Sequence, residues 1–216
     1  MKAGSTVDSA TRADPVFGSI RLDGAGTFFS SSSDADRDNR NFSGTISGTA
    51  SLTVTGRNVE VYTFNSTTAN TYSGGTFFTA NDRYVVRANT TGAFGTGNVT
   101  VSPRANADNR SAAVYFAADN IMASSATLSL TGTGGGSSTG FATEFNSNSA
   151  LIHLATGTNT NLAALFYNGV DQGAGVFTNS VATPWILGSG TLTVIPEPSA
   201  ALLGALGFLA LLRRRR

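Results

Sequence analysis

The sequence predicts an all-β chain that folds as a solenoid and ends in a short hydrophobic helix. Between residues 16 and 194, short stretches rich in Thr, Val, Leu, Phe and Tyr alternate apolar with polar positions. Gly, Asn, Ser and Asp separate these stretches, as turn residues separate strands. Several strand-turn pieces recur along the chain, and a different pattern begins at residue 195. These observations favour a β-solenoid body over residues 16–194 and a separate tail over residues 195–216.

Four predicted strands share one pattern, in which two aliphatic residues face one way and Thr, Ser or Asn faces the other. That alternation has the two-residue period of a strand. The four segments are residues 51–56, 98–102, 127–132 and 191–194. Smaller pieces also recur, since Gly26-Thr27-Phe28-Phe29 returns as Gly75-Thr76-Phe77-Phe78. Modules that recur at uneven distances favour a solenoid in which each coil buries its aliphatic face against the next.

One stretch of the chain carries a more specific pattern. Asn70-Thr71-Tyr72-Ser73-Gly74-Gly75-Thr76 is followed by a Gly-Thr-Gly turn and a Thr/Val strand within residues 92–101, and Ile46-Ser47-Gly48 precedes it. Residues 42–102 therefore resemble the autotransporter-associated β-strand repeat, with Phe94 in place of the usual Leu. The resemblance implies a right-handed parallel β-helix, the fold of passenger and large surface proteins. Its Gly-Gly pair is expected to let the backbone turn tightly at a coil corner.

Residues 150–194 resemble the closing segment of bacterial proteins that combine this repeat with a sorting tail. Asn168-Gly169 lies between two strand-like runs and is a strong hairpin signal. We expect this region to cap the open end of the solenoid, because an exposed sheet edge invites pairing with other chains. A β-sandwich, such as a carbohydrate-binding module, is the alternative architecture, since the spacing of the turns also fits it.

The tail has three parts in a fixed order: Pro196-Glu197-Pro198, an apolar run over residues 199–212, and Arg213 to Arg216. Prolines fit the first turn of a helix and therefore mark its start. A helix over the apolar run rises about 21 Å, which is short of the roughly 30 Å hydrocarbon core of a bilayer. The arginines favour the cytoplasmic side, so the rest of the chain is predicted to lie outside.

This order of parts resembles the PEP-CTERM sorting signal of Gram-negative bacteria. The resemblance implies an exosortase-like membrane transpeptidase as partner, which cleaves near Pro196, Glu197 and Pro198. It also implies a transient stay in the inner membrane, with Arg213, Arg214, Arg215 and Arg216 as the membrane stop, before transfer to the cell surface or extracellular matrix. A permanently retained tail anchor is the alternative.

An exported protein needs an N-terminal signal with an apolar core, and residues 1–8 contain no such run. We therefore expect residues 1–15 to be an unstructured start, and the chain to be truncated or its start codon misplaced.

The composition of the chain excludes several classes of function. Cysteine is absent, which excludes disulfides and thiol chemistry. The only basic cluster is the terminal arginine block, so no nucleic-acid partner is predicted.

Candidate catalytic residues are few. Gly136-Ser137-Ser138-Thr139-Gly140 matches Gly-x-Ser-x-Gly, with Glu144 and His153 following in triad order. That motif needs a strand-to-helix elbow in an α/β sheet, whereas here it lies in a Gly/Ser-rich stretch of an all-β chain, which favours a loop. His153 is the only histidine, which excludes a zinc site built on a His pair.

Asp34, Asp36 and Asp38 form a weak calcium candidate, because alternate carboxylates can direct oxygen ligands at one ion. The pattern of an EF-hand fails, since Asn39 stands where Gly is required and Thr45 where Glu is required. Arg37 and Arg40 would partly neutralise the cluster. We therefore predict neither a metal site nor a cofactor.

Tyrosines and scattered charges complete the set of candidates. Tyr62, Tyr72, Tyr84 and Tyr115 either stack on sugars or belong to the core. A polysaccharide lyase on a β-helix needs Asp, Arg or Lys clustered along one face. The candidates Asp82, Arg83, Arg87, Arg104 and Asp108 are too scattered in sequence to predict such a site. The prediction is a non-enzymatic surface or matrix protein, with adhesion or exopolysaccharide interaction as its role. An extracellular carbohydrate-binding or carbohydrate-active β-domain with the same tail is the alternative.

Overall fold

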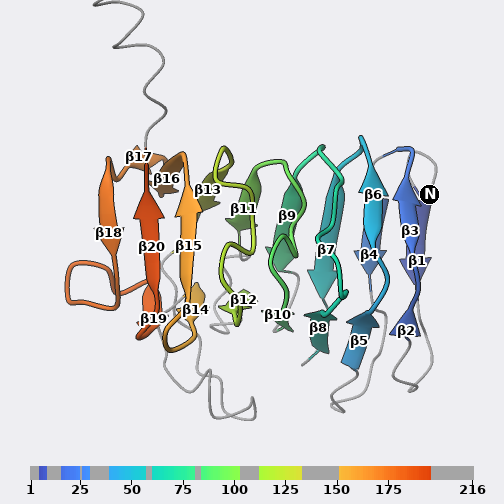
Figure 1. The fold of residues 1–216 in the computed structure, drawn as a ribbon, viewed down its shortest axis with the longest axis horizontal. Helices are drawn as coiled ribbons and strands as arrows, with labels where there is room; N and C mark the ends of the chain where they lie inside the picture. The colour runs from blue at the N-terminus through green and yellow to red at the C-terminus, as the bar shows by residue number, and fades with distance from the viewer. Residues whose placement is uncertain are drawn as a thin grey trace, which may run out of the picture.

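Every regular element that the structure describes is a β-strand. The structure is a computed structural model, and it describes residues 5–8, 16–24, 26–29, 39–56, 60–80, 84–102, 112–132 and 151–195. Two large sheets run along the length of the molecule, and smaller sheets lie on a third side (Figure 1). The hydrophobic helix predicted within the tail lies outside the described residues. Within those residues, no helix has the length and apolarity needed to cross a membrane.

The first large sheet has eight strands and the second has seven. In spatial order the first contains β1 (Ser5–Asp8), β4 (Gly26–Phe29), β7 (Leu52–Gly56), β9 (Thr76–Ala80), β11 (Val99–Ser102), β13 (Thr127–Leu130), β16 (Ala164–Tyr167) and β17 (Val170–Asp171). The second contains β19 (Ile186–Gly188), β14 (Ile152–Leu154), β12 (Ala112–Phe116), β10 (Tyr84–Ala88), β8 (Glu60–Phe64), β5 (Asn39–Phe42) and β2 (Val16–Phe17).

The third side carries β3 (Ile20–Leu22) paired with β6 (Ile46–Gly48), and β20 (Thr191–Val194) between β15 (Asn159–Leu162) and β18 (Gly175–Phe177). From β1 to β6 the strands lie on the first sheet, the second sheet and the third side in turn, and from β7 to β14 they alternate between the two large sheets. Up to β16, each return to a large sheet adds a parallel strand beside the previous one. Every pair within the two large sheets is parallel except β16 with β17. This topology is consistent with a β-solenoid, whereas the sheets of a β-sandwich are antiparallel.

Residues in register across the first sheet form two buried rows. One row contains Leu52, Thr76, Val99, Leu128 and Leu165, and all five side chains are buried. The other runs from Val54 through Phe78 and Val101 to Leu130, again fully buried. The predicted strands in 51–56, 98–102 and 127–132 therefore stack on one sheet. The strand at 191–194 does not join them, because it pairs with β15 and β18 on the third side.

The second sheet contributes an aromatic row to the core. Phe17 and Phe42 stack with ring centroids 5.0 Å apart, and Phe42 and Phe64 stack at 4.7 Å. Ala88 follows in the same row, next to Phe64, and Phe116 comes after it. The ring missing at Ala88 is supplied by Phe94, which lies edge-on to Phe64, Phe78 and Phe116 at centroid distances of 5.6, 4.9 and 6.2 Å. The small residue and the displaced ring together keep the row filled.

The 70–76 motif forms the corner between the third side and the first sheet. The backbone N–H groups of Thr71 and Ser73 donate to the carbonyl oxygens of Ile46 and Gly48, at 2.9 and 3.1 Å. Gly75 has φ +92°, and a Cβ on Gly74 would lie 2.3 Å from the carbonyl carbon of Ala50. Glycine is therefore required at Gly74 by the close approach of the preceding coil and favoured at Gly75 by its positive φ.

The last coil departs from parallel pairing. β16 and β17 form an antiparallel hairpin, and Asn168 and Gly169 form its turn with φ values of +49° and +78°, as a type I′ turn requires. β18 then pairs antiparallel with β20. Trp185 is buried and stacks on Tyr167 with a centroid distance of 5.2 Å. The division of the chain into body and tail remains a prediction.

Candidate functional site

The outer face of the first sheet carries one continuous row of hydroxyl and aromatic side chains. Register places Thr53, Phe77, Thr100, Ser129 and Phe166 side by side on consecutive strands. All five are partly exposed, and Phe77 is the most exposed at 38%. These positions are the outward halves of the same alternation that buries Leu52 and Leu128.

The geometry of this row is set by the sheet. Neighbouring strands lie about 4.8 Å apart, so the five side chains form a line with regular spacing. Each hydroxyl offers one donor and two acceptor lone pairs, and Phe77 offers an apolar ring among them. None of the five carries a charge, although Asp171 pairs with Phe166 at the end of the row. The row can hydrogen-bond and pack against a neutral, hydroxyl-rich chain, but its own side chains supply no acid or base.

A second outward row lies on the second sheet and has different chemistry. It contains Thr63, Arg87, Tyr115, His153 and Leu187 in register, each partly buried. The rings of Tyr115 and His153 meet edge-on with centroids 4.7 Å apart. His153 therefore lies on an outward strand position, and an aromatic neighbour orients it.

The structure decides between the two predicted roles for two of the four tyrosines. Tyr62 and Tyr72 are buried in the core, so neither can stack on a sugar. The hydroxyl of Tyr62 donates to the carbonyl oxygen of Thr55 at 3.0 Å. Tyr115 lies on the outward row of the second sheet, and the side chain of Tyr84 is outside the described set.

Tyr72 belongs to a buried polar network. Its hydroxyl lies 2.5 Å from the Oγ1 atom of Thr76, which in turn donates to the carbonyl oxygen of Phe94 at 3.1 Å. Burial raises the pKa of Tyr72 above its ordinary value, which favours the neutral phenol that this network uses. The network explains how Thr76 occupies an otherwise aliphatic row, because its hydroxyl has partners inside the core.

Asn70 has an equally structural role. Its buried side chain accepts a hydrogen bond from the backbone N–H of Ile46 at 2.7 Å and donates to the carbonyl oxygen of Ala93 at 2.7 Å. One amide thus joins three successive coils. The Asn, Tyr, Gly and Thr positions of the 70–76 motif all contribute to coil stacking rather than to a ligand site.

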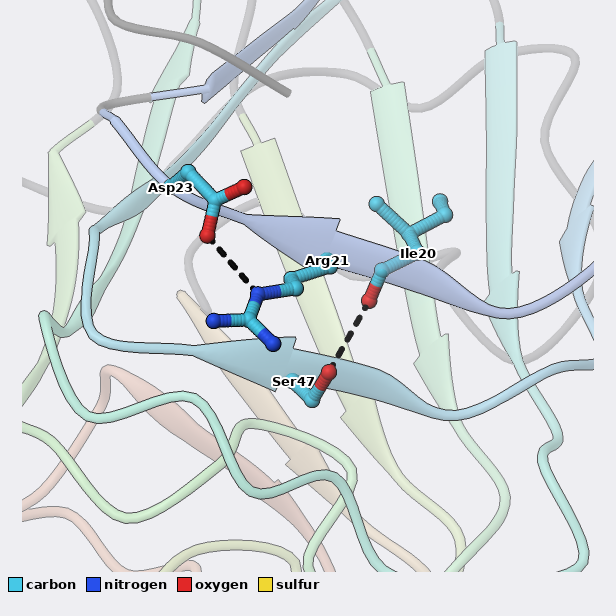
Figure 2. A network of polar contacts seen from close by, with 4 residues as sticks. All are labelled: Ile20, Arg21, Asp23 and Ser47. Carbon is cyan, nitrogen blue, oxygen red and sulfur yellow. Dashed lines mark hydrogen bonds and ion pairs between the residues drawn. The ribbon is translucent and has the colours of Figure 1, made fainter.

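An ion pair marks the third side at the N-terminal end of the described body. Arg21 on β3 donates from Nε to a carboxylate oxygen of Asp23 at 2.8 Å (Figure 2). This hydrogen bond holds the pKa of Asp23 below its ordinary value. Both side chains are well exposed, so we interpret the pair as a local surface contact. The neighbouring strand β6 contributes Ser47, whose Oγ lies 3.5 Å from the carbonyl oxygen of Ile20 (Figure 2).

The remaining predicted site residues lie outside the described part of the chain. They are Asp34, Asp36 and Asp38 of the calcium candidate, Ser138 and Glu144 of the triad candidate, Pro196, Glu197 and Pro198 of the sorting motif, and Arg213, Arg214, Arg215 and Arg216. Across residues that are described, no group of three or more His, Asp or Glu side chains is arranged to hold a metal ion.

The outward hydroxyl row has a partial sequence signal. The Thr and Ser positions opposite the aliphatic ones are visible in the strand pattern, but Phe77 within the row is not, because the neighbouring Phe78 shows the same residue type on the buried side.

Comparison with known protein families, with curated proteins and with solved structures finds no match to this chain. The side-chain chemistry of the two outward rows is therefore the basis for a functional proposal.

Proposed function

We propose that this chain is a non-enzymatic, exported protein of the cell surface or extracellular matrix, built as a right-handed parallel β-helix. The parallel sheets support the fold, and connections between parallel strands of one sheet are right-handed in about 98% of cases. The order Pro-Glu-Pro, apolar run and arginine block supports delivery through the inner membrane and processing by an exosortase-like transpeptidase.

The observation that carries the functional part is the outward row from Thr53 to Phe166. An uncharged line of hydroxyls with an exposed ring fits a neutral exopolysaccharide, whose hydroxyl groups need hydrogen-bond partners and whose sugar faces pack on aromatic rings. The row has the repetitive spacing of the sheet, and a polysaccharide is itself a repetitive ligand. Many weak contacts along such a line add up through multivalency.

A carbohydrate-active domain is the second candidate, favoured by the second outward row. Arg87, Tyr115 and His153 place a cation, a phenol and an imidazole side by side. Glycoside hydrolysis ordinarily needs two carboxyl groups flanking the scissile bond. No Asp or Glu occupies this row between Thr63 and Leu187 in the described strands, so we rank binding above catalysis.

The test is a binding assay of the purified full chain in mild detergent against a neutral β-glucan, a mannan and a galactan, with analysis of the products. We expect binding without turnover. Phe77→Ser should weaken binding about five- to tenfold, which corresponds to roughly 1–1.4 kcal/mol. Val16→Ser is the matched control, because Val16 is also exposed but lies away from the row. Released oligosaccharides would contradict the non-enzymatic assignment, and equal effects of both substitutions would contradict the row as the binding surface.

A further inference from the structure

The last coil gathers most of the exposed large apolar side chains of the described structure. Val170, Val176, Val181 and Ile195 have relative exposures of 63, 64, 100 and 56%. In the rest of the described chain, the exposed large apolar side chains are Val16 at 66% and Phe77 at 38%. We call these four residues the apolar cap.

The four side chains come from the end of the molecule that the chain leaves at Ile195. Val170 is on β17 and Val176 is on β18, and both strands are outermost in their sheets (Figure 1). Val181 lies in the connection from β18 to β19. Val176 is in register with Thr193, so its Cα lies within roughly 10 Å of Ile195 by strand geometry.

Charge is nearly absent from this end. Between Asn168 and Ile195 the sequence contains one charged residue, Asp171, and no Lys or Arg. Large exposed apolar side chains gathered at one end of a molecule, with little charge among them, are typical of an interaction surface.

The position of the tail identifies the occupant. The apolar run begins at Ser199, four residues after Ile195, and four extended residues span at most about 14 Å. Insertion of residues 199–212 in the bilayer would therefore bring Ile195, and with it Val176, close to the headgroup region. An uncharged surface with valine side chains is compatible with that boundary, where interfacial segments bury their apolar face.

We propose that the apolar cap docks on the lipid surface while the tail is inserted, so that the end of the solenoid rests on the membrane. This inference rests on the membrane insertion in the proposed function. A second copy docked cap to cap is the competing occupant. We favour lipid because the tail continues directly from the cap and holds it beside the bilayer.

Labelling can test the docking cleanly, because the chain contains no cysteine. Single variants Val176→Cys, Val181→Cys, Leu206→Cys and Val16→Cys of the full chain are labelled with a polarity-sensitive fluorophore. They are then reconstituted in phosphatidylethanolamine–phosphatidylglycerol vesicles with or without a lipid-borne quencher. We expect strong quenching at positions 176, 181 and 206, and several-fold less at position 16. Val16 is the matched control, with an exposure of 66% at the opposite end of the molecule.

The outcomes separate this inference from the function on which it rests. If the label at position 206 is quenched but the labels at positions 176 and 181 are quenched no more than the label at position 16, the tail inserts and the cap does not dock. Loss of quenching at 206 as well would overturn both. A spectral shift at 176 without vesicles, together with an interchain disulfide between Val176→Cys chains on mild oxidation, would assign the cap to a second copy and overturn the lipid docking.

Discussion

The middle coils, residues 60–102, and the last coil, residues 164–195, differ in how tightly their neighbours constrain them. In the middle coils Asn70 joins three coils through one buried amide. A Cβ on Gly97 would lie 2.4 Å from the backbone nitrogen of Gly75 in the preceding coil. In the outer part of the last coil, Gly169 and Gly173 have no atom within 4 Å of where a Cβ would lie, whereas a Cβ on Gly188, beside the preceding coil, would lie 2.0 Å from the carbonyl oxygen of Leu154.

The difference follows from the number of neighbours. A middle coil is packed between two others, so its backbone approaches a second backbone on both sides. The last coil meets a neighbour on one side only and ends in antiparallel strands with exposed valines. Tolerance to substitution should therefore be highest in the antiparallel strands β17 and β18 and their turns, and not at Gly188, which packs against the preceding coil.

The largest expected effect comes from exchanging matched glycines for alanine. Gly95 has φ +68°, and a Cβ there would lie 2.4 Å from the carbonyl oxygen of Tyr72. Gly173 has φ +71° with open space around it. Gly95→Ala should lower the free energy of unfolding by about 3 kcal/mol or more, because conformational strain and a backbone clash add. Gly173→Ala should cost only the strain, about 1 kcal/mol. Urea unfolding followed by circular dichroism measures both, and similar losses would contradict the difference between the regions.

Asn70→Ala should have the next largest effect. The substitution leaves the N–H of Ile46 and the carbonyl of Ala93 without their side-chain partner, and each unsatisfied buried group costs about 1–3 kcal/mol. We expect a loss of roughly 2–4 kcal/mol in the same assay. Asn65→Ala is the control, since Asn65 is exposed, and it should change stability by less than about 0.5 kcal/mol. If Asn70→Ala lowers the free energy of unfolding as little as Asn65→Ala does, the side-chain amide of Asn70 does not stabilise the contact between coils.

Much of the fold follows from local patterns, but the assignment of strands to sheets does not. Alternation tells which side of a strand is buried, and the Asn168-Gly169 signal marks the hairpin at which the structure turns. The segment 191–194 has the same alternation as 51–56 and still lies on the third side. Its sheet depends on where the chain turns, and the turns depend on contacts between coils that are distant in sequence.

Register shows the same dependence. The repeated Gly-Thr-Phe-Phe pieces do not stack in equivalent positions, because Gly26 is in line with Leu52 and Thr76 rather than with Gly75. A shift of one residue exchanges the two faces of a strand, so a repeated motif does not by itself identify the outward residues. For this reason the outward row containing Phe77 could not be assembled from the sequence, while its Thr and Ser members could be suspected.

The smallest predicted effect tests the aromatic core against the edge. Phe94 is fully buried and meets three other phenylalanines, whereas Phe177 on β18 is only partly buried. Phe94→Leu should cost about 1–2 kcal/mol, since it removes edge-to-face contacts and leaves the space beside Ala88 incompletely filled. Phe177→Leu should cost less than about 1 kcal/mol. If thermal unfolding shows Phe94→Leu to be neutral, the ring does not compensate for Ala88, and the aromatic row ends at Phe64. If the loss is as expected, Phe94 and Ala88 form one unit of packing.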